Sequence, residues 1–154
     1  MTAEVKRESK LDWILVGWWL AVVCAIIGLA DSIYLAWLKL SGGLAACGGI
    51  GDCESVNASI YSQINGIPIA LLGAGAFFLI LLFLFLESRD DFIGDWSPMI
   101  VFGLSLTGTL YSIYLTYIEI AVLKAICPYC VLSAVAVLII FVISIARLRR
   151  SDTH

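Results

Sequence analysis

Cysteines whose spacing suits thiol–disulfide exchange stand at two places in this chain. Cys127-Pro128-Tyr129-Cys130 runs into an unbroken apolar segment, and a second pair, Cys47 and Cys53, stands in a long loop. Two thiols separated by two residues at a helix start can close a disulfide with little strain, and the helix N-terminus favours the thiolate. Pro128 suits the first helical turn, where its missing N–H costs nothing. The motif therefore suits electron exchange with other thiols.

The segments around these cysteines have the composition of a membrane protein. Hydrophobic residues make up 62% of the 154-residue chain and charged residues 14%. A helix needs about 20 apolar residues to cross a bilayer, where it satisfies its own backbone hydrogen bonds. Apolar segments of that length lie at about residues 13–40, 67–86, 98–120 and 129–146. We therefore expect an all-α membrane protein, a bundle of four transmembrane helices in one domain over residues 13–146.

The distribution of basic residues predicts the orientation of this bundle. Most lysines and arginines lie on the side of the two termini, namely Lys6, Arg7, Lys10, Arg89, Arg147, Arg149 and Arg150, whereas the other side carries Lys39 and Lys124. Basic residues concentrate on the cytoplasmic side of a membrane, so residues 1–12 and the tail 147–154 are predicted to be cytoplasmic. Both cysteine pairs then lie on the outer face of the cell membrane, where disulfides form and persist.

A long outward loop joins the first two predicted helices. It runs from Ser41 to Gly66, and loops longer than neighbouring helices need are usually functional or disordered. Its first part is rich in glycine and is predicted to be mobile. Its second part, residues 53–64, is predicted to form a short amphipathic helix at the membrane interface. Such a helix would cover a site that opens between the transmembrane helices.

Two weaker patterns accompany the cysteines. The segments that begin at Gly28 and Gly108 share several residues in register, which indicates either two related helical hairpins or coincidence in apolar sequence. Tyrosines gather in the outward halves of the first and third predicted helices, at Tyr34, Tyr111, Tyr114 and Tyr117. Interfacial anchoring or interior packing explains these tyrosines, and an aromatic pocket for a flat ligand is the alternative.

Two cysteine pairs on one face of a membrane suggest an electron relay. A mobile loop pair would accept electrons from the dithiol of a soluble partner and then attack the fixed pair through a mixed disulfide. The fixed pair would pass two electrons to a quinone, which dissolves in lipid and takes up two electrons with two protons. The chain has no Gly-rich phosphate loop and no histidine in a predicted span, so a quinone is the simplest acceptor.

Other interpretations of the cysteines stay open. Four outward cysteines could bind zinc, but five residues separate Cys47 from Cys53 and His154 lies on the opposite side, so we expect no metal. A non-enzymatic transport or scaffold protein with structural disulfides is the second alternative. Asp31 is an acid inside a span, and such acids often mark transport paths. It lies in the outer part of the first helix, however, where we expect it to pair with a nearby donor or to be solvated. Cys24, in the middle of the first span, is expected to be a buried, inert thiol.

The joint spacing resembles the vitamin K epoxide reductase family. That family has four core membrane helices, a loop cysteine pair, a serine six residues after the second loop cysteine, and Cys-x-x-Cys at the start of the fourth helix. The corresponding residues here are Cys47, Cys53, Ser59, Cys127 and Cys130. Gly66-Ile67-Pro68 also looks like bacterial members, and the resemblance covers nearly the whole chain. An unrelated class of four-helix quinone reductases distributes its cysteine pairs differently among the loops.

The resemblance implies a role for each of these residues. Cys47 would exchange with the partner protein, and Cys53 would form a bridge to Cys127. Cys130 would face the quinone. Ser59 would belong to a short helix that caps the quinone site, with a helix cap or turn residue as the alternative. The resemblance thus implies a membrane thiol:quinone oxidoreductase that drives disulfide-bond formation.

Departures from the family pattern refine this expectation. Many bacterial members carry a fused thioredoxin-like domain, whereas this chain ends soon after its fourth apolar segment. We therefore expect a stand-alone, prokaryotic-type member with a separate thioredoxin-fold partner on the outer face, and no nucleic-acid partner. Vertebrate members carry Thr-Tyr-Ala after the second cysteine, and Ser133-Ala134-Val135 stands nearby here. That difference argues against epoxide reduction, and among quinones of the menaquinone, ubiquinone or vitamin K type it favours the first two.

Overall fold

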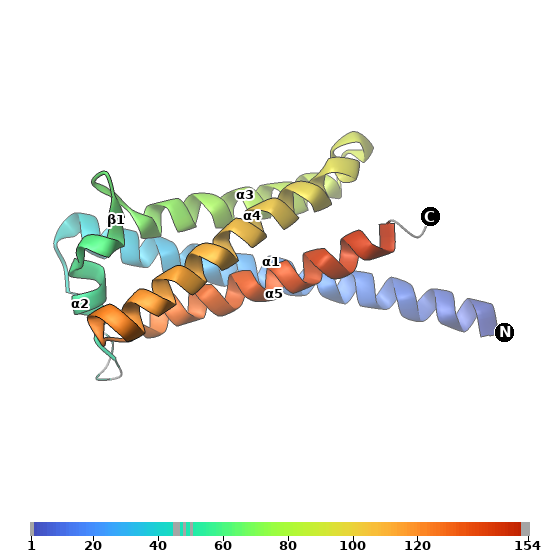
Figure 1. Ribbon diagram of the computed structural model, residues 1–154. Helices are drawn as coiled ribbons and strands as arrows, with labels where there is room; N and C mark the ends of the chain where they lie inside the picture. Colours follow the sequence, from blue (N-terminus) through green and yellow to red (C-terminus); the bar gives the residue numbers. More distant parts are fainter. Residues whose placement is uncertain (1, 45–46, 48, 50, 152–154) are drawn as a thin grey trace.

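Long helices running side by side make up most of the molecule (Figure 1). The computed structural model describes residues 2–44, 47, 49 and 51–151. The long helices are α1 (Thr2–Ser41), α3 (Ile69–Glu87), α4 (Asp91–Tyr117) and α5 (Pro128–Ser151). Within the described residues, four helices are long and apolar enough to cross a membrane. The expected all-α bundle of four transmembrane helices is therefore confirmed.

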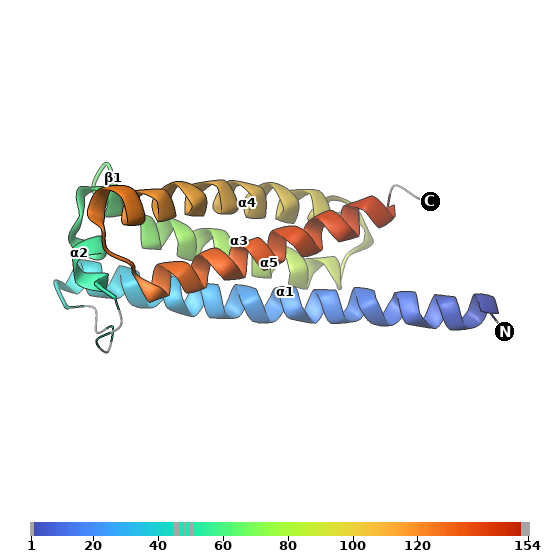
Figure 2. The same ribbon diagram turned by 60° about the horizontal axis from the view of Figure 1, so that its bottom comes forward.

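Several helices extend beyond their predicted bounds. Helix α1 begins at Thr2 rather than at residue 13, so the described part of the N-terminal segment continues the helix past the rest of the bundle (Figure 2). Helix α4 begins at Asp91 and contains Pro98, which was expected to start it. Helix α5 continues to Ser151 instead of ending at residue 146. Apolar runs locate the part of a helix that suits lipid, whereas backbone hydrogen bonds continue into polar residues beyond it.

The bundle encloses an apolar core. Helix α1 packs against α3 and α5, and α4 packs against the same two helices. The buried core residues are Ala21, Cys24, Ala25, Phe77, Ile80, Leu84, Val101, Ala136, Val137 and Ile140. Cys24 is among them, as expected for an inert thiol. Large apolar side chains such as Trp19, Phe78 and Val142 cover the outside of the bundle, as a surface that faces lipid requires.

The two glycines of the sequence repeat lie at close helix contacts. A Cβ added to Gly28 on α1 would lie 2.3 Å from the Phe77 ring on α3. A Cβ added to Gly108 on α4 would lie 2.9 Å from Val137 on α5. Each glycine therefore allows its helix to approach the next transmembrane helix closely. These contacts agree with two similar hairpins, and the symmetry between the hairpins stays a prediction.

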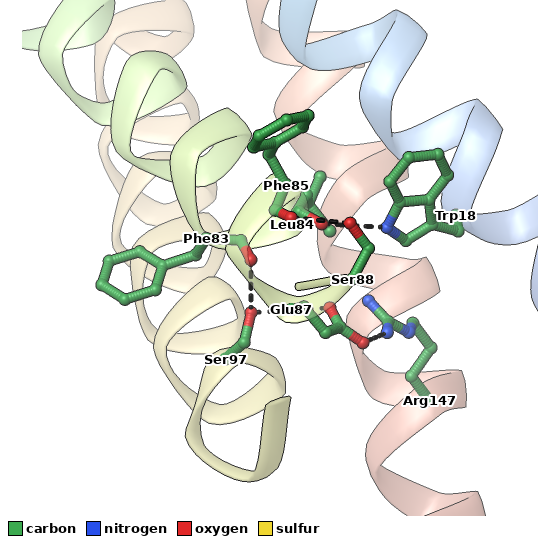
Figure 3. Close-up of polar contacts among 8 residues, drawn as sticks. All are labelled: Trp18, Phe83, Leu84, Phe85, Glu87, Ser88, Ser97 and Arg147. Carbon is green, nitrogen blue, oxygen red and sulfur yellow. Dashed lines mark hydrogen bonds and ion pairs between the residues drawn. The ribbon is translucent and has the colours of Figure 1, made fainter. Parts of the chain in front are cut away.

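Polar contacts join the helices at the end of the bundle where both termini lie (Figure 3). Glu87, the last residue of α3, forms an ion pair with Arg147 on α5. Ser97 Oγ on α4 donates a hydrogen bond to the Phe83 carbonyl oxygen (3.0 Å), and Trp18 Nε1 on α1 donates one to a carbonyl of the last turn of α3 (3.2 Å). These contacts link α3 to the three other long helices at this end of the bundle.

The loop at the opposite end is more compact than predicted. It contains α2 (Cys53–Ala58), the 3₁₀-helix η1 (Ile60–Ser62) and a hairpin of β1 (Gln63–Ile64) and β2 (Ile67–Pro68). The prediction of one amphipathic helix over residues 53–64 is therefore wrong beyond Ala58. Asn65 and Gly66 both have positive φ, which suits a tight hairpin turn and ends any helix there. The mobility predicted for the glycine-rich part, residues 42–51, stays a prediction, and its residues 45, 46, 48 and 50 lie outside the described residues.

Candidate active site

Both cysteine pairs lie together at the loop end of the bundle. Cys53 begins α2, Cys127 immediately precedes α5, and Cys130 lies in the first turn of α5. Cys53 and Cys127 are each 1% exposed and belong to one buried cluster. Cys47 and Cys130 are partly buried and pack against that cluster. The structure therefore brings together the four cysteines that the sequence singles out.

The disulfide in this structure joins the two loop cysteines. Cys47 and Cys53 are bonded, with their Cα atoms 6.0 Å apart. Cys127 and Cys130, both in the described part of the chain, are not in a disulfide. The family resemblance implied a bridge between Cys53 and Cys127, and the structure has Cys53 paired with Cys47 instead. The two bridges use the same Cys53 sulfur, so only one of them can exist at a time.

Backbone contacts hold the loop pair against the start of α5. The Asp52 N–H donates a hydrogen bond to the Ile126 carbonyl oxygen (3.0 Å), which links the residues that precede Cys53 and Cys127. The Asp52 side chain caps α2 by accepting hydrogen bonds from the Ser55 N–H (3.0 Å) and hydroxyl (2.6 Å). These hydrogen bonds lower the pKa of Asp52, so the cap stays ionised at neutral pH.

Gly51 allows this close approach, and its substitution gives a first prediction. Gly51 has φ +86°, and an added Cβ would lie 2.3 Å from the Ile126 carbonyl oxygen. We expect Gly51→Ala to slow quinone reduction by a protein dithiol about tenfold or more, because the left-handed backbone costs about 1–2 kcal/mol and the clash moves Cys53 away from Cys127. Reduction by a small dithiol should be unchanged.

The control for this variant is Gly49→Ala. Gly49 also has positive φ (+81°), but nothing lies within 4 Å of an added Cβ. Turnover with each donor, followed optically, separates the clash from the backbone strain. Equal loss in the two variants would show that the contact with Ile126 does not position the loop pair.

Cys127 has the surroundings of a reactive thiol. A hydrogen bond from the Cys130 side chain lowers the pKa of Cys127, and hydrogen bonds with the backbone of Cys130 and Tyr129 lower it further. Backbone N–H groups at a helix start stabilise a thiolate in this way. A thiol of lowered pKa leaves readily in thiol–disulfide exchange, so Cys127 suits exchange with the neighbouring Cys53.

Glu119 is a site residue that the sequence analysis missed. It lies in the π-helix η2 (Ile118–Leu123), which continues α4, and it is 4% exposed. Its Oε2 accepts a hydrogen bond from the Cys127 N–H (3.2 Å). Asp31 is the acid singled out inside a predicted span, whereas Glu119 lies at the edge of the third apolar segment. The cost of a carboxyl group in such a segment was the signal that could have identified it.

An apolar cavity of about 480 Å³ adjoins the second cysteine pair. It lies between the transmembrane helices, under α2 and the residues that follow α2. Its polar lining comes mainly from Ser32, Asn57, Ser59, Ser62, Thr107, Tyr111, Ser112, Thr116, Glu119, Cys127, Cys130 and Ser133. Sites for small ligands typically have 300–1,000 Å³ and a few polar groups in an apolar wall. The cavity therefore has the size and chemistry of a site for an apolar molecule with a few polar atoms.

Ser59 and the tyrosines occupy different places around this cavity. Ser59 lines the cavity and also ends α2, where its hydroxyl donates a hydrogen bond to the Val56 carbonyl oxygen (2.8 Å). Among the four tyrosines singled out, Tyr111 lines the cavity. Tyr34 packs on Tyr129, with ring centroids 5.3 Å apart. Tyr114 and Tyr117 are 48% and 65% exposed, which suits interfacial anchors.

Helix α2 and the 3₁₀-helix η1 form the cover of the cavity. Lys39 binds both parts of this cover, and its substitution gives a second prediction. Its ammonium group, near the end of α1, donates hydrogen bonds to the Asn57 carbonyl oxygen and to Ser62 Oγ. Hydrogen bonds to charged groups contribute about 1.5–3 kcal/mol. We therefore expect Lys39→Met to raise the KM for a quinone about tenfold with little change in kcat, measured at saturating dithiol.

Lys124→Met is the matched control, because Lys124 is the other lysine on the loop side of the bundle and its side chain is exposed. Its KM should stay at the wild-type value. An unchanged KM in Lys39→Met would show that these hydrogen bonds do not position the cover.

Asp31 lies on α1, inside the bundle, where it faces α5. It is 8% exposed, and one of its carboxylate oxygens accepts a hydrogen bond from the Ser133 hydroxyl. The other oxygen has no hydrogen-bond partner among the described residues. The expected pairing of Asp31 with a nearby donor is thus present for one of its two oxygens.

The fold and the site together define a class of protein. A membrane bundle with a reduced cysteine pair at the start of its last helix, a disulfide in the adjoining loop and an apolar cavity beside them is suited to thiol–disulfide redox chemistry. The model of the vitamin K epoxide reductase family matches residues 19–145, and the chain belongs to that family. The members of this family are membrane oxidoreductases that act on disulfides and quinones. The match includes both cysteine pairs.

Proposed function

We propose that the protein is a thiol:quinone oxidoreductase that drives disulfide formation outside the membrane. Electrons would pass from a thioredoxin-fold partner to the loop pair, then to the second pair, and finally to a quinone. The observation that carries this proposal is the position of three sulfurs. Cys53 and Cys127 share one buried cluster, and Cys130 lines the apolar cavity. A continuous route therefore joins the loop to a place where a lipid-soluble acceptor fits.

The first half of the reaction is exchange between thiols. The partner's dithiol reduces the loop disulfide by attack on Cys47, and the partner becomes oxidised. The Cys53 thiolate then attacks the Cys127 sulfur of a Cys127–Cys130 disulfide, which forms a mixed disulfide and releases Cys130 as a thiolate. Attack of Cys47 on Cys53 closes the loop disulfide again and releases Cys127. The pairing in the structure, with the loop pair oxidised and the second pair reduced, is the state expected after this step.

The second half transfers two electrons to the quinone. The thiols of Cys127 and Cys130 together lose two electrons and two protons as their disulfide closes. The quinone gains two electrons and two protons and leaves as the hydroquinone. Cys130 would face the ring of a quinone of the menaquinone, ubiquinone or vitamin K type, and Ser59 would contact it from the cover of the cavity. Both residues line the same cavity, which supports these assignments.

The orientation of the protein follows from its charges. Both termini would lie in the cytoplasm and the cysteines on the outer face, because basic residues gather at the end of the bundle with the termini. The two termini lie at the same end of the bundle, opposite α2 (Figure 1), which supports this arrangement. A separate thioredoxin-fold protein would then meet the loop pair from the outer compartment.

The test of this function is a measurement of both products. Purified protein in detergent is supplied with a reduced thioredoxin-fold protein and a short-chain quinone, and quinone loss is followed optically while donor thiols are counted. We expect one quinone reduced for each donor dithiol oxidised. Absence of turnover with every quinone and dithiol, while the loop disulfide stays intact, would favour a structural or transport protein.

A further inference from the structure

Glu119 is a buried carboxyl group in contact with both residues of the second cysteine pair. Its side chain accepts a hydrogen bond from the Cys127 N–H (3.2 Å), and the Cys130 thiol is a hydrogen-bond partner of the same carboxyl group. Glu119 also lines the cavity beside Cys130. One carboxyl group is thus placed to touch a reacting thiol and any molecule in the cavity.

The backbone around Glu119 is built to place this group. Helix α4 changes at Ile118 into the π-helix η2, and such segments are frequent at functional sites. The π-helix ends at Leu123, and the next residue, Lys124, has φ +51°. The Glu119 carbonyl oxygen accepts a hydrogen bond from the Ala125 N–H (3.0 Å). A buried carboxyl group in a membrane segment is costly. Residues 124–127, which connect η2 to α5, do not need a buried carboxyl group as an anchor, because the Glu119 carbonyl oxygen already accepts a hydrogen bond from Ala125.

We infer, on the basis of the proposed function, that Glu119 is the catalytic base that takes the proton of Cys130 when the reduced pair gives its electrons to the quinone. The Cys130 S–H bond breaks, and its proton moves to a Glu119 carboxylate oxygen. The sulfur–sulfur bond with Cys127 closes as two electrons pass to the quinone. Glu119 then gives its proton to one quinone oxygen, and the second proton, released by Cys127, reaches the other oxygen through water.

The groups around Glu119 leave few other candidates for this role. The titratable groups that face it from the start of α5 are Cys127 and Cys130, which are the reacting thiols. On α2, Cys53 is held in a disulfide and Glu54 is exposed. On α4, Tyr111 lines the same cavity, but a neutral phenol is a weak base at neutral pH.

The test is a single turnover of pre-reduced protein with a short-chain quinone in a stopped-flow instrument, from about pH 6 to about pH 9. Glu119→Gln keeps the shape and a carbonyl acceptor but removes the base. We expect its rate near neutral pH to fall about 10²-fold or more and then to rise about tenfold per pH unit, as hydroxide takes over the proton. The wild type should vary less. Glu54→Gln, the same change on the exposed face of α2, should match the wild type.

The shape of the pH profile separates catalysis from structural support. A Glu119→Gln rate that equals the wild-type rate, or that is lower by the same factor at every pH, would overturn the inference. If this variant does not fold, Glu119→Asp decides, because it should be slower but keep the wild-type profile, and a steeply rising profile would overturn the inference. A wild type that does not reduce quinone would overturn the proposed function, and the inference with it.

Discussion

Replacement of Cys130 by alanine is expected to lower quinone reduction by about 10³-fold or more with every dithiol donor. Cys127 and Cys130 both line the apolar cavity, and Cys127 also lies in the buried cluster with Cys53. Without Cys130, the second pair cannot close its own disulfide, and a bridge from Cys127 to the buried Cys53 would trap the loop pair instead of completing the reaction. The loop disulfide between Cys47 and Cys53 should still form, because it does not involve Cys130.

Steady-state quinone reduction, followed optically with a reduced thioredoxin-fold donor, measures this effect. Cys24→Ala is the matched control, because Cys24 lies in the apolar core of the bundle, and it should keep the wild-type rate within about twofold. Turnover that survives in Cys130→Ala would remove the second pair from the reaction. If Asp31→Asn abolished the function of the protein at the same time, the transport alternative would gain support.

The spans and the cysteine motifs can be predicted from this sequence because each is a local property. Twenty consecutive apolar residues cannot avoid lipid or a protein core, and a Cys-x-x-Cys at a helix start has the same chemistry in any fold. The approach of Cys53 to Cys127 is not local. It depends on the hydrogen bond from Asp52 to Ile126 and on the absence of a side chain at Gly51. The loop contains several glycines, and nothing in the sequence distinguishes Gly51 as the one that makes this contact.

The loop and Glu119 show two further limits of prediction from sequence. The amphipathic pattern after Cys53 favours a helix, but Asn65-Gly66 sets a hairpin turn and the chain leaves the helix at Ser59. Glu119 stands at the edge of an apolar segment, where an acidic residue can equally face water. Only the π-helix and the return of the chain through residues 124–127 turn it toward the cysteines.

Replacement of Cys47 by serine is expected to separate the two kinds of electron donor. A protein dithiol would meet the loop pair at Cys47, because Cys47 is the partly exposed member of the pair and Cys53 is 1% exposed. Cys47→Ser should therefore lower turnover with a thioredoxin-fold donor about 10²-fold or more. A small membrane-permeant dithiol should still support turnover within a few-fold of wild type, because it can reach the Cys127–Cys130 pair without the loop.

Cys127→Ser is the comparison that gives this result its meaning. It removes one member of the pair beside the cavity, so both donors should fail equally, whereas Cys47→Ser should affect the protein donor alone. Quinone reduction measured with each donor, at matched donor concentrations, supplies the four rates. Equal loss with both donors in Cys47→Ser would contradict a loop shuttle, since Cys47 would then be needed even when no protein docks. In that case the loop disulfide would have a structural role, namely to hold Cys53 in place, and electrons would enter at the second pair.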